Sequence, residues 1–204
     1  MRRKRTAIFI SGRGSNMRAL VEAAAAPDFP AQIALVLSNR PDAEGLAFAK
    51  KHGIATAAVD HKIYVGRDEF EAVIERLLAL HRIELICLAG FMRLLTAGFV
   101  SRWTGRMINI HPSLLPAYRG LHSHERALAD GVAEAGCTVH FVVPEIDAGP
   151  IIAQARVPVL AGDDADTLAA RVLTEEHRLY PQALRKVAEG AVRIECPTLP
   201  GAFA

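Results

Sequence analysis

Cysteine is scarce in this chain of 204 residues, which holds only Cys87, Cys137 and Cys196. The three lie far apart and form no Cys-x-x-Cys pair, so a zinc ribbon and a dithiol redox motif are both disfavoured. Cys87 falls inside an apolar strand pattern, where a thiol packs as a small core residue. We therefore expect a cytoplasmic protein, because the cytoplasm is the default compartment for such cysteine usage.

The chain also lacks a long apolar run, since the longest of note, Leu85 to Phe91, has seven residues. A helix needs about 20 apolar residues to cross a bilayer, so no membrane association is expected. No apolar segment follows the basic start Met1 to Arg5, which argues against a signal peptide. A solvated terminus before the first strand is favoured over a nucleic-acid-binding tail.

An excess of one charge is missing as well. The chain carries 24 basic and 22 acidic residues, a net charge of +2, which argues against a nucleic-acid-binding protein. A local basic site for a small anion is still compatible with this balance. Apolar residues make up 51% of the chain, enough for a core that excludes disorder as the main state.

Short β-rich runs alternate with longer helical patterns as far as His111. We expect strands at residues 7–10, 33–37, 55–59, 85–89 and 107–110, and helices at 16–25, 43–52, 68–81 and 96–103. Such alternation predicts βαβ units, and hence an α/β fold with an open, mostly parallel twisted sheet and helices on both faces, as in Rossmann-like proteins.

The rhythm changes after His111. A proline-rich loop at 112–120 and a helix at 123–130 precede two strand-like runs at 138–143 and 151–159, and a long helix is predicted at 166–187. The segment 144–150 joins the two runs and suits a long hairpin, so antiparallel strands are expected in this half. We predict a single domain over residues 1–204, with halves 1–111 and 112–204.

A glycine loop, Ser11-Gly12-Arg13-Gly14-Ser15-Asn16, follows the first predicted strand and enters a helix. Glycine permits tight backbone geometry, and a helix N-terminus offers free N–H groups to an anion, so the loop is suited to a phosphate. Its spacing is neither GxGxxG nor GxxxxGK[ST], which disfavours a dinucleotide and an NTP P-loop. A turn that merely enters the helix is the alternative.

Asn109 and His111 stand two residues apart at the end of an apolar strand, so their side chains leave the same face of the sheet. An amide and an imidazole there suit the polarisation of a carbonyl and the movement of a proton. A turn-supporting asparagine and a satisfied, partly buried histidine form the alternative. Metal ligation by His111 with His122 and His124 is disfavoured, because no cysteine or carboxylate stands at ligand spacing.

Two acids and one further histidine carry weaker signals. Asp147 lies in a loop bounded by glycine and proline, where it either forms a turn or orients a histidine and raises the pKa of that histidine. Glu176 falls on the apolar stripe of the long C-terminal helix and needs a partner: Arg171 or His177 in a structural role, a substrate hydroxyl or amine in a functional one. For His140 a functional and a packing role are equally open.

Four motifs together resemble the folate-dependent phosphoribosylglycinamide formyltransferases of purine biosynthesis. They are Ile10-Ser11-Gly12-Arg13-Gly14-Ser15-Asn16, Leu88-Ala89-Gly90-Phe91-Met92-Arg93, Asn109-Ile110-His111-Pro112-Ser113-Leu114-Leu115-Pro116 and Ile146-Asp147-Ala148-Gly149-Pro150. The resemblance covers the chain from about Thr6 to Val187 in the family's order and spacing. The glycine loop discriminates this family, because the other motifs occur in other folate formyl transferases and hydrolases.

The resemblance implies a catalytic trio, two substrate sites and no metal. The trio would be Asn109, His111 and Asp147. The ribonucleotide would be bound by Gly12, Arg13, Gly14, Ser15, Asn16, Leu173, Thr174, Glu175 and Glu176. The cosubstrate, 10-formyltetrahydrofolate, would be bound by Arg67, Leu88, Met92, Arg93, Leu94, Leu95, Asn109, Val143, Pro144, Glu145, Ile146 and Asp147.

The same resemblance assigns phosphate binding to the half 1–111 and folate binding with catalysis to the half 112–204. Pro144 departs from the family, which more often has an acid there, and it removes one backbone donor from the folate loop. The implied reaction is direct attack of the glycinamide amine on the formyl carbon. Partners would be these small molecules without nucleic acid or membrane, and the oligomeric state, a homodimer included, is left open.

Three alternatives follow from the shared motifs. A formyltetrahydrofolate hydrolase would use the same asparagine, histidine and aspartate, but usually carries an N-terminal regulatory domain before its first strand. A methionyl-tRNA formyltransferase would need an RNA-binding domain after Val187, where only about 17 residues follow. A nucleotide-binding module without chemistry is the non-enzymatic alternative.

Overall fold

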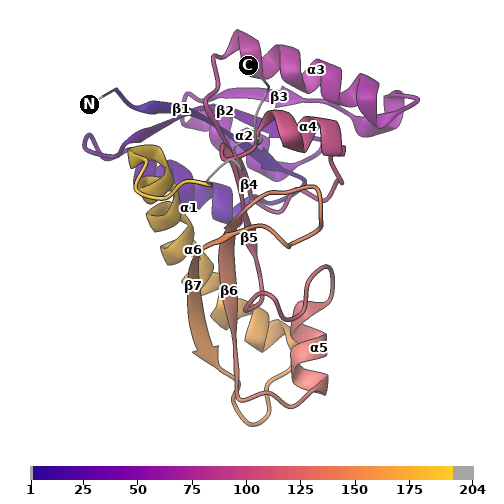
Figure 1. Cartoon of the computed structure of the whole chain (residues 1–204), viewed down its shortest axis with the longest axis vertical. Helices are drawn as coiled ribbons and strands as arrows, with labels where there is room; N and C mark the ends of the chain where they lie inside the picture. The colour runs from indigo at the N-terminus through magenta and orange to yellow at the C-terminus, as the bar shows by residue number, and fades with distance from the viewer. Residues whose placement is uncertain (1, 195–204) are drawn as a thin grey trace, which may run out of the picture.

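Within residues 2–194, which the computed structural model describes, seven strands form one sheet in the order β3-β2-β1-β4-β5-β6-β7 (Figure 1). The strands are β1 Lys4–Ile10, β2 Ala31–Ser38, β3 Ala55–Ala58, β4 Leu85–Leu88, β5 Met107–His111, β6 Glu134–Phe141 and β7 Ile151–Pro158. The first five pair in parallel, whereas β6 runs antiparallel to β5, and β7 to β6. The predicted sheet, with antiparallel strands from the second half, is confirmed. Cys196 lies outside the described residues.

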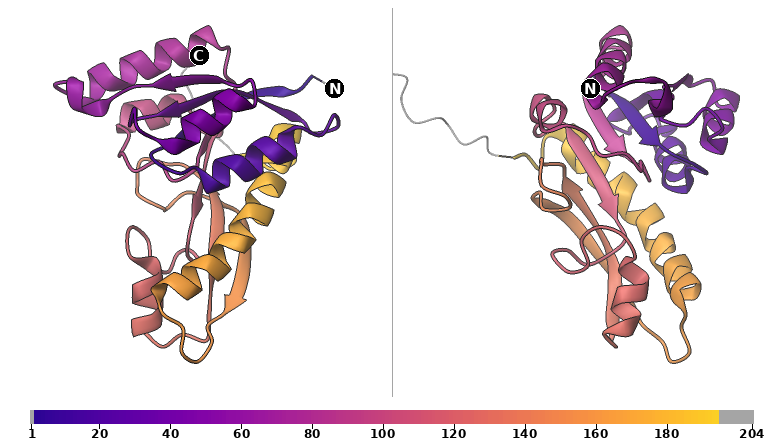
Figure 2. Two further views of the ribbon diagram at one scale, coloured as in Figure 1. Left: turned by 180° about the vertical axis from the view of Figure 1, so that it is seen from behind. Right: turned by 90° about the vertical axis from the view of Figure 1, so that its right-hand side faces the viewer.

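Helices cover both faces of the sheet. They are α1 Ser15–Ala24, α2 Glu44–Lys51, α3 Arg67–Leu80, α4 Ala97–Arg102, α5 Ser123–Ala129 and α6 Ala165–Glu189, with a 3₁₀ turn η1 at His61–Ile63. Alternate residues of β1 point to opposite faces: Ile8 and Ile10 pack in one core cluster with α1, α2 and α6, and Ala7 and Phe9 in another with α3 and α4. Figure 2 shows α6 lying along α1 on the first face.

The strand β6 begins at Glu134, four residues before the predicted start at Thr138. Glu134 and Gly136 interrupt the apolar pattern at this end, so the sequence analysis does not predict it as strand. Gly136 is required by the pairing with β7, because a Cβ there would lie 2.0 Å from the carbonyl oxygen of Ala155. The strand ends at Phe141, where the chain leaves toward the loop 142–150.

The basic N-terminus, which the sequence analysis expects to be solvated ahead of the first strand, is only partly so. Lys4 and Arg5 already belong to β1. The Arg5 guanidinium donates to the carbonyl of His81 at 2.6 Å, and Arg3 donates to the carbonyl of Ala31 at 2.7 Å. These arginines therefore satisfy backbone carbonyls around the amino end of the sheet.

The long helix α6 is fixed to the sheet by a buried tyrosine. Tyr180 is fully buried, and its hydroxyl lies 2.9 Å from the carbonyl oxygen of Leu88 and 3.2 Å from that of Ile108. These carbonyls belong to β4 and β5, so the helix is held against the two central strands. The helix begins at Ala165, one residue before the predicted start, and Asp164 and Thr167 form a capping box at its N-terminus.

Candidate functional site

The strand order creates a crevice at the carboxyl ends of β1 and β4. The chain continues from β1 to one side of the sheet and from β4 to the other, and ligands of open α/β sheets bind at such a switch point. Three candidate segments leave this edge: residues 11–16 after β1, residues 89–96 after β4, and the end of β5. The sequence motifs are thus brought to one edge of the sheet.

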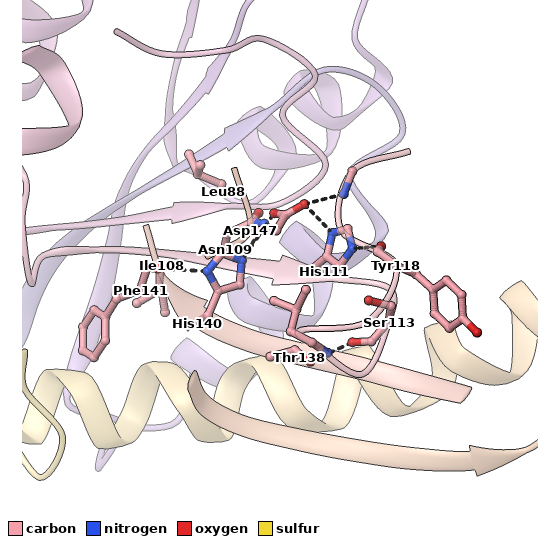
Figure 3. A network of polar contacts seen from close by, with 12 residues as sticks. Leu88, Ile108, Asn109, His111, Ser113, Tyr118, Thr138, His140, Phe141 and Asp147 are labelled. Carbon is pink, nitrogen blue, oxygen red and sulfur yellow. Dashed lines mark hydrogen bonds and ion pairs between the residues drawn. The ribbon is translucent and has the colours of Figure 1, made fainter. Parts of the chain in front are cut away.

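A polar cluster of Asn109, His111, His140 and Asp147 lies beside this crevice (Figure 3). Asn109 and His140 are direct partners in the register of β5 with β6, and the Asn109 amide lies 3.3 Å from Nε2 of His140. Asp147 comes from the loop between β6 and β7. Its carboxylate lies 3.3 Å from Nδ1 of His111 and 3.6 Å from Nε2 of His140. The predicted trio is therefore brought together, with His140 as a fourth member.

A glycine lets the loop return close to β6. A Cβ at Gly149 would lie 1.8 Å from the carbonyl oxygen of Phe141, so any other residue would push the loop away from the strand. Asp147 itself has a positive φ of 48°, a conformation that costs energy for a residue with a side chain. The backbone N–H of Gly120 donates to its carboxylate at 2.9 Å and holds it in this place.

Hydrogen bonds to backbone carbonyls show which ring nitrogen of each histidine carries a proton. Nε2 of His111 lies 2.9 Å from the carbonyl of Tyr118, which can only accept, so this nitrogen carries a proton and Nδ1 faces Asp147. Nδ1 of His140 lies 2.9 Å from the carbonyl of Phe141 and donates to it. Its Nε2 therefore accepts from the Asn109 amide when the ring is neutral.

The pKa of His111 lies below its ordinary value of 6.5, chiefly because the ring is buried. The Tyr118 carbonyl and the Asp147 carboxylate oppose this lowering, and burial outweighs them. The expectation that Asp147 raises the pKa of His111 above the ordinary value is therefore wrong in its net direction. Burial also acts to raise the pKa of Asp147, but the hydrogen bond from the Gly120 N–H and the nearby His140 and His111 rings bring it below its usual range. The carboxylate is thus charged beside a neutral imidazole at pH 7.

A hollow next to the cluster gathers most of the residues that the resemblance assigns to folate. They are Leu88, Arg93, Leu94, Leu95, Asn109, Val143, Pro144, Glu145, Ile146 and Asp147, joined by Phe91, Val100, His140 and Val142. Arg67 lines an adjoining hollow, whereas the Met92 side chain is 71% exposed and lines neither. His111 does not line the hollow, but its ring contacts Asp147, which does. Nε of Arg93 is buried without a partner among the described residues.

The glycine loop presents the free end of α1. Gly14 is the N-cap with a positive φ of 70°, and no side chain caps the helix. The first N–H groups of α1 are therefore open to an anion. The loop is braced by α2, because the N–H of Gly45 donates to the carbonyl of Gly12 at 3.1 Å. Arg13 is exposed and Ser15 is the first helical residue.

A buried acid lies beside this loop. The Asn16 amide donates to Glu176 at 2.6 Å, and burial raises the pKa of Glu176 above its ordinary value against the opposing effect of Asn16. Oδ1 of Asn16 is buried and has no partner among the described residues. The structural partners predicted for Glu176 are wrong, because Arg171 pairs with Asp163 at 2.6 Å and no bond joins His177 to Glu176 among the described residues.

The other candidates on α6 form contacts within the helix. The Thr174 hydroxyl donates to the carbonyl of Ala170, and Glu175 pairs with Arg178 at 2.9 Å. Leu173 is partly buried. Of this turn, Glu176 is therefore the residue whose side chain reaches the glycine loop.

The described residues show neither a metal-binding cluster nor a membrane-spanning helix. Across 2–194, no group of three or more histidine, cysteine or acidic side chains could hold a metal ion. Within the same range, no helix combines the length and the apolarity that a membrane span requires.

Sequence reasoning did not identify the full role of the loop 118–122. Tyr118, His122 and Gly120 all have a positive φ, and the loop holds both His111 and Asp147 through backbone atoms. Gly120 was the only signal of such a turn in the sequence. Ser11, at the start of the glycine loop, was also missed as a separate element, although its hydroxyl contacts two other segments.

The fold and the cluster at the strand ends define a class of protein. A family model described as formyl transferase matches residues 4–184, nearly the whole described range, and this is the class. The chain belongs to the phosphoribosylglycinamide formyltransferase family.

Three similar proteins support this membership. The crystal structure of phosphoribosylglycinamide formyltransferase from Brucella melitensis is 54% identical, with a TM-score of 0.89 over 94% of this chain and 98% of that one. The phosphoribosylglycinamide formyltransferase of Escherichia coli K12 is 42% identical over 92% of this chain and 88% of its own length. The human trifunctional purine biosynthetic protein adenosine-3 is 47% identical over 95% of this chain, but the chain spans only 19% of that protein.

Proposed function

We propose that this protein transfers the formyl group of 10-formyltetrahydrofolate to the amine of 5'-phosphoribosylglycinamide, a step of de novo purine biosynthesis that leads toward IMP. The observation that carries the proposal is that the glycine loop after β1 and the polar cluster of β5 share the carboxyl edge of one sheet. A phosphorylated amine bound at the first can therefore meet a formyl donor bound at the second. The whole chain, residues 1–204, acts as one formyltransferase domain.

The phosphate of the ribonucleotide binds at the free N-terminus of α1, where Gly12 to Ser15 offer backbone N–H groups. Glu176 and the unpartnered Oδ1 of Asn16 accept hydrogen bonds from the ribose hydroxyls. Oδ1 of Asn16 suits a ribose hydroxyl, because a buried acceptor without a partner requires a donor from a ligand or water. Arg13 adds positive charge at the exposed side of the loop.

The folate ring system binds in the hollow of Leu88, Arg93, Leu95, Asn109 and the loop 142–147. The buried, unpartnered Nε of Arg93 fits a polar heterocycle, which supplies an acceptor. Exposed apolar side chains at its rim, Leu94 and Ile146, suit the apolar part of such a ligand. Pro144 contributes no backbone donor to this loop, so the contacts there rely on its neighbours.

The reaction joins the amine nitrogen to the formyl carbon and breaks the bond from that carbon to N10 of the folate. The Asn109 amide donates to the oxygen that becomes negative. Asp147 lines the hollow and contacts the neutral His111, so the pair accepts the amine proton and shares it between the carboxylate and Nδ1. The same pair delivers a proton to N10, which balances the transfer. Holding both substrates in line supplies much of the remaining acceleration.

Formyl transfer by the purified chain tests this function. The protein is mixed with 10-formyltetrahydrofolate and the ribonucleotide, and the absorbance of the folate product is followed with and without the amine. Amine-dependent release together with formylated ribonucleotide supports the proposal. Release of formate without the amine would instead indicate a hydrolase, and binding without turnover a nucleotide-binding module.

We further propose that the reaction needs no metal and takes place in the cytoplasm. A metal-independent reaction is supported by the chemistry, because a neutral amine is already a nucleophile and Asn109 supplies the oxyanion donor. Activity that survives extended dialysis against EDTA is expected, and its loss with recovery on adding Zn²⁺ or Mg²⁺ would contradict this. Analytical ultracentrifugation of the chain decides between a monomer and a homodimer.

A further inference from the structure

A short segment without regular structure, residues 92–95, forms one wall of the folate hollow. It connects β4 to α4 and contributes Arg93, Leu94 and Leu95 to the lining. With no strand or helix to hold it, its position depends on the bonds at its two ends. Each end is fixed by one buried side chain from another part of the molecule.

At the first end, the backbone N–H of Met92 donates to the hydroxyl of Ser11 at 2.7 Å. Ser11 is buried and is the first residue of the glycine loop. Its hydroxyl also donates to Oδ1 of Asn39 at 2.5 Å. The hydroxyl therefore accepts one hydrogen bond from the folate wall and donates another to the residue after β2.

Asn39 is itself held rigidly. It is 2% exposed, and its carbonyl lies 2.9 Å from Nδ1 of His61, which donates to it from the 3₁₀ turn η1. The amide nitrogen of Asn39 lies 3.2 Å from the same ring nitrogen. The Ser11 hydroxyl is thus aimed by a fixed acceptor, and this leaves one of its lone pairs directed at Met92.

At the second end, Glu71 of α3 accepts from the backbone N–H of Thr96 at 2.6 Å and from the Thr96 hydroxyl. Glu71 is also buried, at 2% exposed. No bond from Glu71 to the glycine loop exists among the described residues, so it fixes only the folate wall. Ser11 and Glu71 therefore differ in one respect: Ser11 also belongs to the segment that binds the phosphate.

We infer that Ser11 is a positioning residue that couples the two substrate sites, because one hydroxyl holds the wall of the folate hollow at a fixed place relative to the phosphate loop. This inference rests on the proposed function. A ribonucleotide bound at the loop stabilises the loop in this arrangement and, through the Ser11–Met92 bond, the wall that follows it, so the folate binds more tightly. Coupling free energies between two sites in one protein correspond to about 5- to 150-fold in affinity.

Calorimetry tests the coupling directly. The ribonucleotide is titrated into the protein with and without tetrahydrofolate, which lacks the formyl group and cannot react, and the reverse titration closes the cycle. In the unmodified protein we expect each ligand to raise the affinity of the other at least about fivefold. Ser11→Ala should weaken both ligands and bring the ratio of affinities close to one, while Ser11→Thr keeps the hydroxyl and the coupling.

Glu71→Gln is the matched control, since it weakens one anchor of the same wall. It should lower the folate affinity alone and leave the coupling intact. The inference is overturned if Ser11→Ala keeps the coupling of the unmodified protein, or if Glu71→Gln loses it to the same extent. Should Ser11→Ala fail to melt cooperatively, Asn39→Ala removes the acceptor of the same hydroxyl and must also reduce the coupling.

The controls separate this inference from the proposed function. Formyl transfer by the unmodified protein is measured in the same buffer, and its absence would refute the function whatever the calorimetry shows. Transfer without any coupling between the two ligands would refute the role of Ser11 and leave the function standing.

Discussion

The glycine loop after β1 and the polar cluster of β5 lie at the same edge of the sheet, but different forces hold them. The loop is shaped by backbone sterics: Gly14 has a positive φ, and a Cβ there would lie 2.8 Å from Cε of Met17. The cluster is shaped by side-chain hydrogen bonds and charge, with Asp147 between two histidines. Substitutions should therefore harm the loop through shape and the cluster through charge.

This difference has a functional counterpart. A phosphate carries its charge from the start, so a preformed cradle of N–H groups is enough to bind it. The amine loses a proton only during the reaction, so the cluster has to change its protonation. A neutral His111 beside a charged Asp147 is suited to that change, because the carboxylate stabilises the imidazolium once it forms.

The largest effect is expected for His111→Ala. Turnover should fall by roughly 10²–10⁴-fold, the usual range for an acid–base group, whereas both substrate affinities change little because His111 does not line the hollow. Steady-state kinetics and calorimetry together measure this. Turnover within about threefold of the unmodified protein would remove His111 from the mechanism and break the contrast between the two regions.

Asp147→Asn should reduce turnover by about 10²-fold at neutral pH and move the pH profile. The carboxylate raises the pKa of His111 against the larger effect of burial, so its removal lowers that pKa further. If the neutral ring is the active form, the rising limb of the pH–rate profile follows the pKa to lower pH. NMR titration of the His111 ring in both proteins decides it: an unchanged pKa would mean that Asp147 acts by shaping the folate loop.

Gly14→Val should lower the ribonucleotide affinity by about 10-fold or more and leave the folate affinity unchanged, because a backbone strain of roughly 1–3 kcal/mol falls on the loop. Gly53→Val is the matched control, since Gly53 has the same φ of 70° with nothing within 4 Å of its would-be Cβ. It should cost stability without affecting either ligand. Equal weakening of both ligands by Gly14→Val would contradict a loop dedicated to the phosphate.

The smallest effect is expected for Glu176→Gln, which tests the one buried acid beside the loop. Burial raises the pKa of Glu176, so the folded protein holds more protons than the unfolded chain above pH 4.5 and its stability falls as pH rises through this window. The glutamine should raise the Tm at pH 7 by a few degrees and flatten the pH dependence. A lower Tm at pH 7 would show that Asn16 already compensates for the buried charge. The ribonucleotide affinity should fall in either case.

The sequence was informative where a pattern is local. Alternating apolar runs predicted the strands, and the two-residue spacing of Asn109 and His111 predicted their common face. The partner of Glu176 was out of reach, because Asn16 lies 160 positions away along the chain. The place of His140 depends on the register of β5 with β6, which no short motif encodes.

The predicted direction of the His111 pKa shift was wrong for a related reason. The charge of Asp147 can be read from a motif, whereas the depth at which the ring is buried follows from the packing of the loop 112–122. The start of β6 was predicted too late along the chain, because Glu134 and Gly136 interrupt the apolar alternation. The pairing with β7 nevertheless requires a glycine at 136. The sequence alone therefore did not predict the features that depend on contacts between residues far apart in the chain.

The contacts of the Tyr180 hydroxyl with the carbonyls of β4 and β5 fix the position of α6 along its own axis. Glu176 precedes Tyr180 by four residues, so it sits one helical turn, about 6 Å, along the axis from the point of attachment. Inserting one residue between them would rotate the acid by about 100° around the helix and away from Asn16. The loop 159–163 is bonded to the helix through Asp163 and Arg171, but its length does not set the spacing of Glu176 and Tyr180. Natural length variation should therefore collect there and be absent between positions 176 and 180.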